Sequence, residues 1–240
     1  MKALALDDSL SETHTAYALA LQHDWEWQEA DKEFRRSIEL NPNYMEVRNF
    51  YAHHLHWLGR VDEALALAQE SEKLDPISAM MATNVGSSFR WARRYDDAIA
   101  SGQRAIELEP TYAPAHGDLG GAYDLKGMYP EAIAELDKAI ELFGRTPVYL
   151  GSLGHAYAVS GRRTQALQVI EELQQPSMLK LQPEVYIALV YAGLREKDSA
   201  FRWLEVAYKE HSGTEIGELR DPFFDPLRSD THYKRAPLLE

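Results

Sequence analysis

Alanine recurs at a fixed spacing of 34 residues along this chain of 240 residues. Alanine fills one position in eight, 30 of 240, so six matches in a row at any one of the 34 possible phases have a chance probability of roughly 10⁻⁴. The six alanines are Ala30, Ala64, Ala98, Ala132, Ala166 and Ala200. Pro42, Pro76 and Pro110 repeat at the same spacing. Such a period predicts an array of one small unit, which offers an extended surface rather than an enclosed pocket.

Each unit is predicted to contain two amphipathic helices, because apolar and small residues recur at steps of three and four. Gly59, Gly127 and Gly161 separate the two helices of their units, since glycine adopts tight-turn conformations readily. The recurring alanine lies early in the second helix, where a methyl side chain lets two helix axes approach to about 8–10 Å. The prolines follow the second helix and prevent it from continuing.

At this length and pattern the chain resembles the tetratricopeptide repeat, W-x₂-L-G-x₂-Y…A-x₃-F…P. The clearest match is the string His116-x₂-Leu119-Gly120-x₂-Tyr123…Ala132-x₃-Leu136. The tryptophan that opens the family pattern is absent from every unit, and its position holds His14, Arg48, Ala82, His116, Leu150 and Glu184. We expect these departures to be tolerated because the position is one packing contact among many. The resemblance implies an all-α fold, a right-handed α-solenoid of helix-turn-helix units with a C-terminal capping helix.

The period predicts six units, at residues 11–44, 45–78, 79–112, 113–146, 147–180 and 181–212. One step of 34 back from Pro42 reaches Asp8, so residues 1–10 are interpreted as the remnant of a preceding second helix. We therefore expect the natural protein to continue upstream of Met1. Residues 213–240 leave the period and are expected to cap the last unit with Phe223, Phe224, Leu227, Tyr233 and Leu238.

Three strings resemble a bacterial subclass of these arrays: DWEWQEADKEFRRSIELNPNY, WLGRVDEALALAQESEKLDP and DPFFDPLRSD. In that subclass the array is attached to a serine/threonine kinase, a nucleotide cyclase or a winged-helix transcription regulator. The resemblance implies a regulatory appendage, and none of those effector domains lies in these 240 residues.

Composition excludes several functional classes. The net charge of −13 argues against nucleic acid, whose phosphates would be repelled. The sequence has no apolar run of ~18 residues, so we expect no membrane insertion. The start MKALALDDSL is not a signal peptide, and the absence of cysteine excludes disulfides and thiolate zinc sites. We expect a cytoplasmic protein, if no anchor lies upstream, and no cofactor.

In this repeat family the first helices line the concave side, so positions five, nine, twelve and thirteen of each unit are expected to face a groove. These positions hold Asn49, His53, His56, Trp57, Thr83, Ser87, Arg90, Trp91, Gly117, Gly121, Asp124 and His155. Aromatic, hydrogen-bonding and small side chains together suit an extended or helical peptide. Trp57 and Trp91 are interpreted as a ladder of anchors for that peptide, the alternative being that they pack between adjacent first helices.

Two other clusters have simpler interpretations. His53, His54 and His56 lie close together, but no third converging ligand is evident, so polar groove lining is favoured over a metal site. Trp25 and Trp27 fall at a turn between helices, where they form an exposed contact site or, as we favour, pack against the preceding half repeat. The sequence shows neither a nucleophile elbow nor a phosphate-binding glycine loop, so we do not expect an enzyme.

The leading hypothesis is a non-catalytic interaction module that binds a protein or peptide in its concave groove. The alternative is a module for self-association, through exposed end repeats, or for intramolecular regulation of an attached effector domain.

Overall fold

The computed structural model describes residues 8–210, 215–228 and 230. Within these ranges the protein is all-α, with no residue in a β-strand. The helices are α1 (Ser11–His23), α2 (Trp27–Leu40), α3 (Met45–Trp57), α4 (Val61–Leu74), α5 (Ala79–Trp91), α6 (Tyr95–Leu108), α7 (Ala113–Lys126), α8 (Tyr129–Phe143), α9 (Pro147–Val159), α10 (Arg163–Leu173), α11 (Pro176–Leu179), α12 (Glu184–Gly193) and α13 (Lys197–Lys209). Two short 3₁₀ helices follow, η1 (Glu215–Arg220) and η2 (Pro222–Leu227). No helix of the described ranges is long and apolar enough to cross a membrane.

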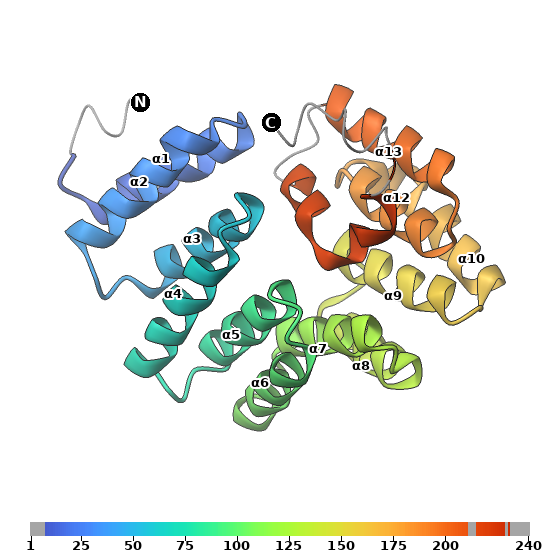
Figure 1. The fold of residues 1–240 in the computed structure, drawn as a ribbon, viewed down its shortest axis with the longest axis horizontal. Coiled ribbons are helices and arrows are strands. Elements are labelled where there is room, and N and C mark those ends of the chain that lie inside the picture. Colours follow the sequence, from blue (N-terminus) through green and yellow to red (C-terminus); the bar gives the residue numbers. More distant parts are fainter. Residues whose placement is uncertain (1–7, 211–214, 229, 231–240) are drawn as a thin grey trace.

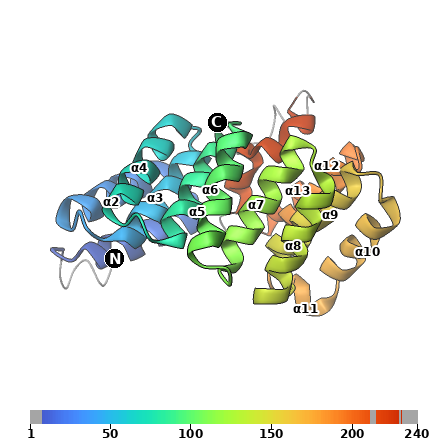
Figure 2. The same ribbon diagram turned by 90° about the horizontal axis from the view of Figure 1, so that it is seen from below.

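The helices pack in consecutive pairs that stack side by side into an arc (Figures 1 and 2). The pairs are α1 with α2, α3 with α4, α5 with α6, α7 with α8, α9 with α10, and α12 with α13. Figure 1 shows α4, α6, α8 and α10, each the second helix of its pair, on the outer side of the arc. The solenoid expected from the period is therefore confirmed.

The close approach within each pair depends on small residues. All six alanines of the 34-residue period are buried, with at most 2% of their surface exposed. In the fourth pair the partner position is Gly120, where an added Cβ would lie 2.7 Å from Cγ of Leu136. A larger residue at either position would push α7 and α8 apart, which explains why the period is strict here.

The turn inside each pair repeats its backbone conformation even where the residue changes. The residues in the left-handed region, with φ between 59° and 82°, are Trp25, Gly59, Arg93, Gly127, Gly161 and Arg195, again 34 apart. After each of them the next amide donates to the carbonyl five residues earlier, as Met128 does to Tyr123 at 2.9 Å. This is the Schellman closure of a helix, and glycine fills its left-handed position in only three of the six units.

The residues that stand where the family pattern has its first tryptophan make polar contacts in at least two units, through His14 and His116. Nε2 of His116 donates to the carbonyl of Pro110 at 3.0 Å, and Nδ1 lies 2.7 Å from the Glu135 carboxylate. His14 makes the same pair of contacts, with Asp8 and Glu33. These side chains therefore tie the loop before the unit to both of its helices, a more specific role than the tolerated packing contact expected from the sequence.

The segment 215–228, which comprises η1 and η2, leaves the arc and lies in its middle (Figure 1). Phe224 and Leu227 share an apolar cluster with Leu189 of α12 and Leu204 of α13. Tyr233 and Leu238, which were expected to help cap the last unit, lie outside the described residues. The described part of the cap is thus two 3₁₀ turns rather than one capping helix.

The two ends of the array meet. The ring of Trp25 stacks on Tyr208 of α13, with centroids 5.3 Å apart and an interplanar angle of 23°. Trp25 and Trp27 both pack against the apolar cluster of the last unit. Most of the preceding half repeat, against which they were expected to pack, lies outside the described residues; within the described ranges the curvature of the arc brings the last unit to these tryptophans.

Candidate functional site

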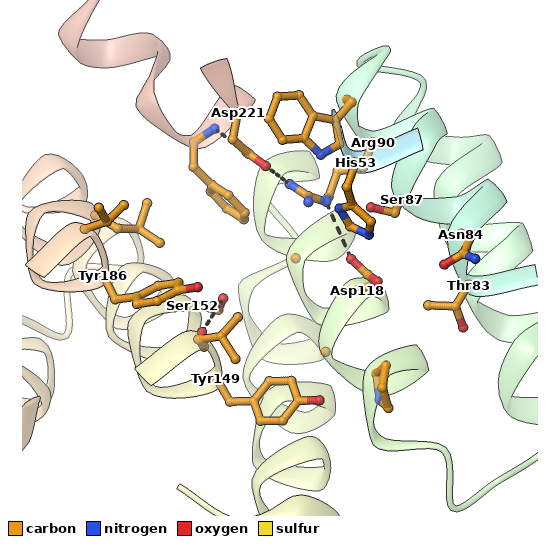
Figure 3. Close-up of a pocket in the computed structure, with 18 of the residues that line it drawn as sticks. His53, Thr83, Asn84, Ser87, Arg90, Asp118, Tyr149, Ser152, Tyr186 and Asp221 are labelled. Atoms are coloured by element: carbon orange, nitrogen blue, oxygen red, sulfur yellow. Dashed lines mark hydrogen bonds and ion pairs between the residues drawn. The ribbon is translucent and has the colours of Figure 1, made fainter. Parts of the chain in front are cut away.

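A cavity of about 380 Å³ opens on the inner side of the arc. Its walls come from α3, α5, α7, α9 and α12, the first helices of five pairs, and from the segment 215–228. Figure 3 shows Thr83, Asn84 and Ser87 of α5 on one side of the space, opposite Tyr149 of α9 and Tyr186 of α12. Residues spread over most of the chain therefore meet in one site only because the units stack.

Eight of the twelve residues expected to face the groove line this cavity: Asn49, His53, Thr83, Ser87, Arg90, Trp91, Gly117 and Gly121. The other four, His56, Trp57, Asp124 and His155, do not line it. Asp124 and His155 are both buried, and Nδ1 of the imidazole lies 2.7 Å from the Asp124 carboxylate. This pair therefore joins α7 to α9 rather than presenting polar atoms to a ligand.

Trp57 and Trp91 do not stand as equivalent rungs of a ladder. Trp91 is only 3% exposed, and its ring stacks on His56 with centroids 5.0 Å apart and an interplanar angle of 3°. Trp57 packs on Trp27, with centroids 6.0 Å apart, and on the backbone of Gly217 in η1. The tryptophans have different neighbours because the segment 215–228 covers Trp57, whereas the adjacent first helix covers Trp91.

The charged centre of the site is Arg90, whose side chain is 10% exposed. Its Nη1 donates to Oδ2 of Asp221 at 2.5 Å, and its Nε lies 3.9 Å from the carboxylate of Asp118. The guanidinium also lies over the ring of Phe223, 5.5 Å from the centroid. Gly121 lies beside this arrangement, where an added Cβ would make ordinary van der Waals contacts with the Phe223 ring at 3.6 Å and the Arg90 side chain at 3.7 Å.

A second ion pair holds the same segment. Nη2 of Arg93 lies 2.8 Å from a carboxylate oxygen of Asp225. The two links pair Asp221 with Arg90 at the end of α5, and Asp225 with Arg93 in the turn that follows. The segment is therefore positioned by charge as well as by the apolar contacts of its aromatic side chains.

Burial controls the protonation of the groups around Arg90. Burial raises the pKa of Asp118 to about 6, with Arg90 opposing the shift and Asp221 adding to it. Burial also lowers the pKa of His53 to about 4, with a smaller contribution from the Arg90 charge. His53 is thus neutral near pH 7, while Asp118 is mostly ionised.

Sequence reasoning missed Asp118 although the period could have revealed it. Asn84, Asp118 and Ser152 occupy position six of three consecutive units, and all three line the cavity. Position six lies about one helical turn from positions two and nine, so all three share one face of the first helix, and positions two and nine also line the cavity. Asp221 carried no such signal, because its segment has left the period.

No set of three histidine, aspartate or glutamate side chains within the described ranges converges as a metal site would require. His53 and His56 face each other edge to face, with ring centroids 6.1 Å apart. The imidazole of His54 is engaged elsewhere, since its ring nitrogens contact Gln22 at 2.8 Å and the carbonyl of Trp27 at 3.1 Å.

Comparisons with known proteins agree with the fold. The tetratricopeptide repeat family model matches residues 92–153. No curated protein matches the sequence. A thermophilic TPR protein of Thermus thermophilus is similar in structure with a TM-score of 0.66 at 22% identity, over 75% of this chain and 98% of that one.

Two further solved structures extend the comparison. PilW, described as a type IV pilus biogenesis factor, has a TM-score of 0.60 at 16% identity, over 83% of this chain and 92% of its own. A chain of the APC/C hetero-tetramer Cut9-Hcn1 has a TM-score of 0.66 at 19% identity; the match covers 100% of this chain but 45% of that one. At these identities the similarity extends to the fold alone.

Proposed function

We propose, from the premise that this chain is an array of tetratricopeptide repeats, that it binds a segment of a partner protein or peptide in its concave groove. Arrays of this kind are generally scaffolds for contacts between proteins. The finer assignment, an extended segment held in the cavity between α5 and α9, is our own.

The observation that carries the proposal is the composition of the cavity walls. Polar side chains of α5, Thr83, Asn84 and Ser87, face the aromatic rings of Tyr149 and Tyr186 across the space (Figure 3). A peptide needs hydrogen-bonding partners for its backbone and apolar surfaces for its side chains. The wall of α5 offers the hydrogen-bonding groups and the tyrosine wall offers the apolar surface. The stacking of the units sets the distance between the two walls.

The segment 215–228 supports the same proposal, since it is a stretch of chain already held in the groove. Asp221 is bound by Arg90, and Phe223 lies against the ring of His155 with centroids 4.9 Å apart. An acidic side chain followed two residues later by an aromatic one is therefore compatible with this surface. The partner would occupy the cavity that remains beside the segment.

The alternative function, intramolecular regulation or self-association, is favoured by this same segment. A groove that already holds part of its own chain can respond to a change in that part. The proposed attachment to a kinase, cyclase or winged-helix regulator rests on the sequence resemblance, as does the proposed cytoplasmic location.

We propose further that the module is not catalytic. Support comes from the hydroxyl groups in the cavity: Oγ of Ser152 donates to the carbonyl of Val148 at 2.9 Å rather than to an imidazole. Nδ1 of the nearby His155 contacts Asp124, and within the described ranges no serine hydroxyl hydrogen-bonds to this imidazole. A serine nucleophile needs a base within hydrogen-bond reach, and these groups do not provide that pair.

Selection from a random peptide library displayed on phage tests the groove. Ser152→Trp places a bulky ring inside the cavity, while Gln168→Trp places the same ring on the exposed face of α10. Peptides selected on the unmodified protein are expected to bind Gln168→Trp within twofold and Ser152→Trp at least tenfold more weakly, both variants keeping their helical circular dichroism. Selected peptides that bind all three proteins equally would refute the groove proposal.

A further inference from the structure

The charges that line the groove do not balance. The charged side chains of the described lining residues are one guanidinium, Arg90, and two carboxylates, Asp118 and Asp221. Arg90 is directed at Asp221, with 2.5 Å between Nη1 and Oδ2, and only its Nε approaches Asp118, at 3.9 Å. His53 is neutral near pH 7, because burial lowers its pKa to about 4. The described lining therefore carries one net negative charge.

Asp118 is the carboxylate that a ligand can reach. Its side chain is 32% exposed, against 4% for Asp221. Figure 3 shows it pointing from α7 into the space between the polar wall of α5 and the tyrosines of α9 and α12. Burial raises its pKa to about 6, because the groove solvates a carboxylate less well than water does. A cation brought by a ligand would offset that cost.

The tyrosine wall suits the same kind of group. Tyr149 packs on Gly117 so closely that a Cβ there would lie 2.6 Å from Cε1 of the ring. Tyr186 packs on Gly151 in a similar way, since a Cβ there would lie 2.7 Å from Cβ and 3.1 Å from Cδ1 of Tyr186. Both rings are thus fixed by glycine-sized neighbours. The face of a tyrosine ring attracts ammonium and guanidinium groups, and a fixed ring loses little entropy on binding one.

We infer that Asp118, together with the wall formed by Tyr149 and Tyr186, is a subsite for a positively charged side chain, arginine or lysine, of the bound segment. The inference rests on the proposed groove function and specifies the chemistry of its partner. The cavity, at about 380 Å³, has room for such a side chain and the backbone that carries it. The rest of the protein adds to the attraction, since its net charge is −13.

Titration with a small cationic probe tests the subsite on the whole chain. N-acetyl-arginine amide is added to ¹⁵N-labelled protein, and the amide signals of Gly117 and Gly121 are followed by NMR. N-acetyl-citrulline amide has nearly the same shape without the charge and is expected to bind at least tenfold more weakly. Asp118→Asn is expected to weaken the arginine probe at least tenfold, while Asp62→Asn, on an exposed position of α4, changes it less than twofold.

The pH dependence of arginine-probe binding supplies a second test of the subsite. The groups that act on Asp118 are Arg90, Asp221, Tyr112 and Tyr149, and His53 lies on the same cavity wall. Since the tyrosines and His53 are neutral between pH 5 and 7.5, protonation of Asp118 is the change expected in that range. Binding of the arginine probe is therefore expected to fall several-fold from pH 7.5 to 5, and this fall is absent in Asp118→Asn.

The outcomes separate this inference from the groove proposal. Equal binding of the arginine and citrulline probes, or binding unchanged by Asp118→Asn, overturns the cationic subsite, while library peptides displaced by Ser152→Trp would still support the groove. Conversely, the arginine probe could bind in a way that depends on Asp118 while the library yields no peptide that binds in the groove. That result would support the subsite and refute the wider groove function. Stronger binding of free putrescine than of the arginine probe would overturn the assignment to a peptide side chain.

Discussion

The seam inside the helix pairs and the groove on the first helices arise from the same 34-residue unit but differ in how the unit varies. In the seam one residue type is kept, and all six alanines are buried. In the groove equivalent positions diverge: position six holds Asn84, Asp118 and Ser152. Packing of two helices has one good solution, so it repeats, whereas a surface that repeated would bind its partner in several registers. For the partner segment proposed above, variation along the groove would favour one register and one direction of binding.

Trp91 has features of both regions. It lies on a first helix and its atoms contribute to the cavity wall, but it is 3% exposed and stacked on His56. Its main role is to pack two first helices together. Substitutions in the seam and in the groove can therefore show how far the two behave as separate regions.

The largest effect is expected from Trp91→Ala. Removing a buried indole leaves a cavity beside His56, so the free energy of unfolding should fall by about 3–5 kcal/mol. Urea unfolding followed by circular dichroism measures it. Trp57→Ala, at a half-buried position, should cost less. A loss below about 1 kcal/mol combined with lost peptide binding would instead identify Trp91 as a groove anchor.

Ala98→Leu tests the seam. The added methylenes must fit between α5 and α6, so we expect a loss of about 1–3 kcal/mol in the same unfolding experiment, with peptide binding retained once the variant is folded. Asn84→Leu, which adds apolar volume in the groove wall, is the matched change and should leave stability nearly unaltered. If the two substitutions destabilise equally, the division between seam and groove fails.

Acid should weaken the fold through His54. The side chain is fully buried, Nε2 donates to the carbonyl of Trp27, and burial lowers its pKa to about 4. In the unfolded chain its pKa is near 6.5, so between pH 6.5 and 4 only the unfolded state takes up the proton. Stability is thus fully present above pH 6.5 and falls by about 1.4 kcal/mol per pH unit for this group as the pH drops toward 4.

Unfolding curves at pH 7.5, 6 and 5 measure that slope. His54→Gln should lower stability at pH 7.5 but flatten the dependence on pH, because the titrating group is gone. His53 and His56, whose pKa values are also lowered by burial, supply the slope that remains. An unchanged slope in His54→Gln would mean that its imidazole does not resist protonation.

The smallest effect is expected at the turns. Arg195 adopts φ 61°, a left-handed conformation in which glycine avoids a steric cost of about 1 kcal/mol. Arg195→Gly should therefore raise the melting temperature slightly. Gly161→Ala is the reverse change at the equivalent position, where nothing lies within 4 Å of the added Cβ, and should lower it by a similar amount. Two shifts of the same sign would show that side-chain contacts, not backbone strain, control these turns.

The sequence was sufficient to predict whatever repeats: the helix pairs, the buried alanines and the glycine turns. The period also predicted eight lining residues, six at positions five and nine and two, Arg90 and Trp91, at positions twelve and thirteen. It could not predict the pairing of Arg90 with Asp221, which are 131 residues apart, since the segment that carries Asp221 has no counterpart in other units. The contact between Trp25 and Tyr208 depends on the accumulated curvature of the whole arc, which no local pattern encodes.

That closure changes how the chain can assemble. An open solenoid makes only neighbour contacts, so its units can fold in any order and its ends separate first. Here η1 and η2 can dock only after α3, α5 and α12 are in place, so the topology imposes a late step of high contact order. During synthesis the first helices leave the ribosome well before Asp221 does. The nascent array is therefore an open arc until residues 215–228 arrive and Asp221 can pair with Arg90.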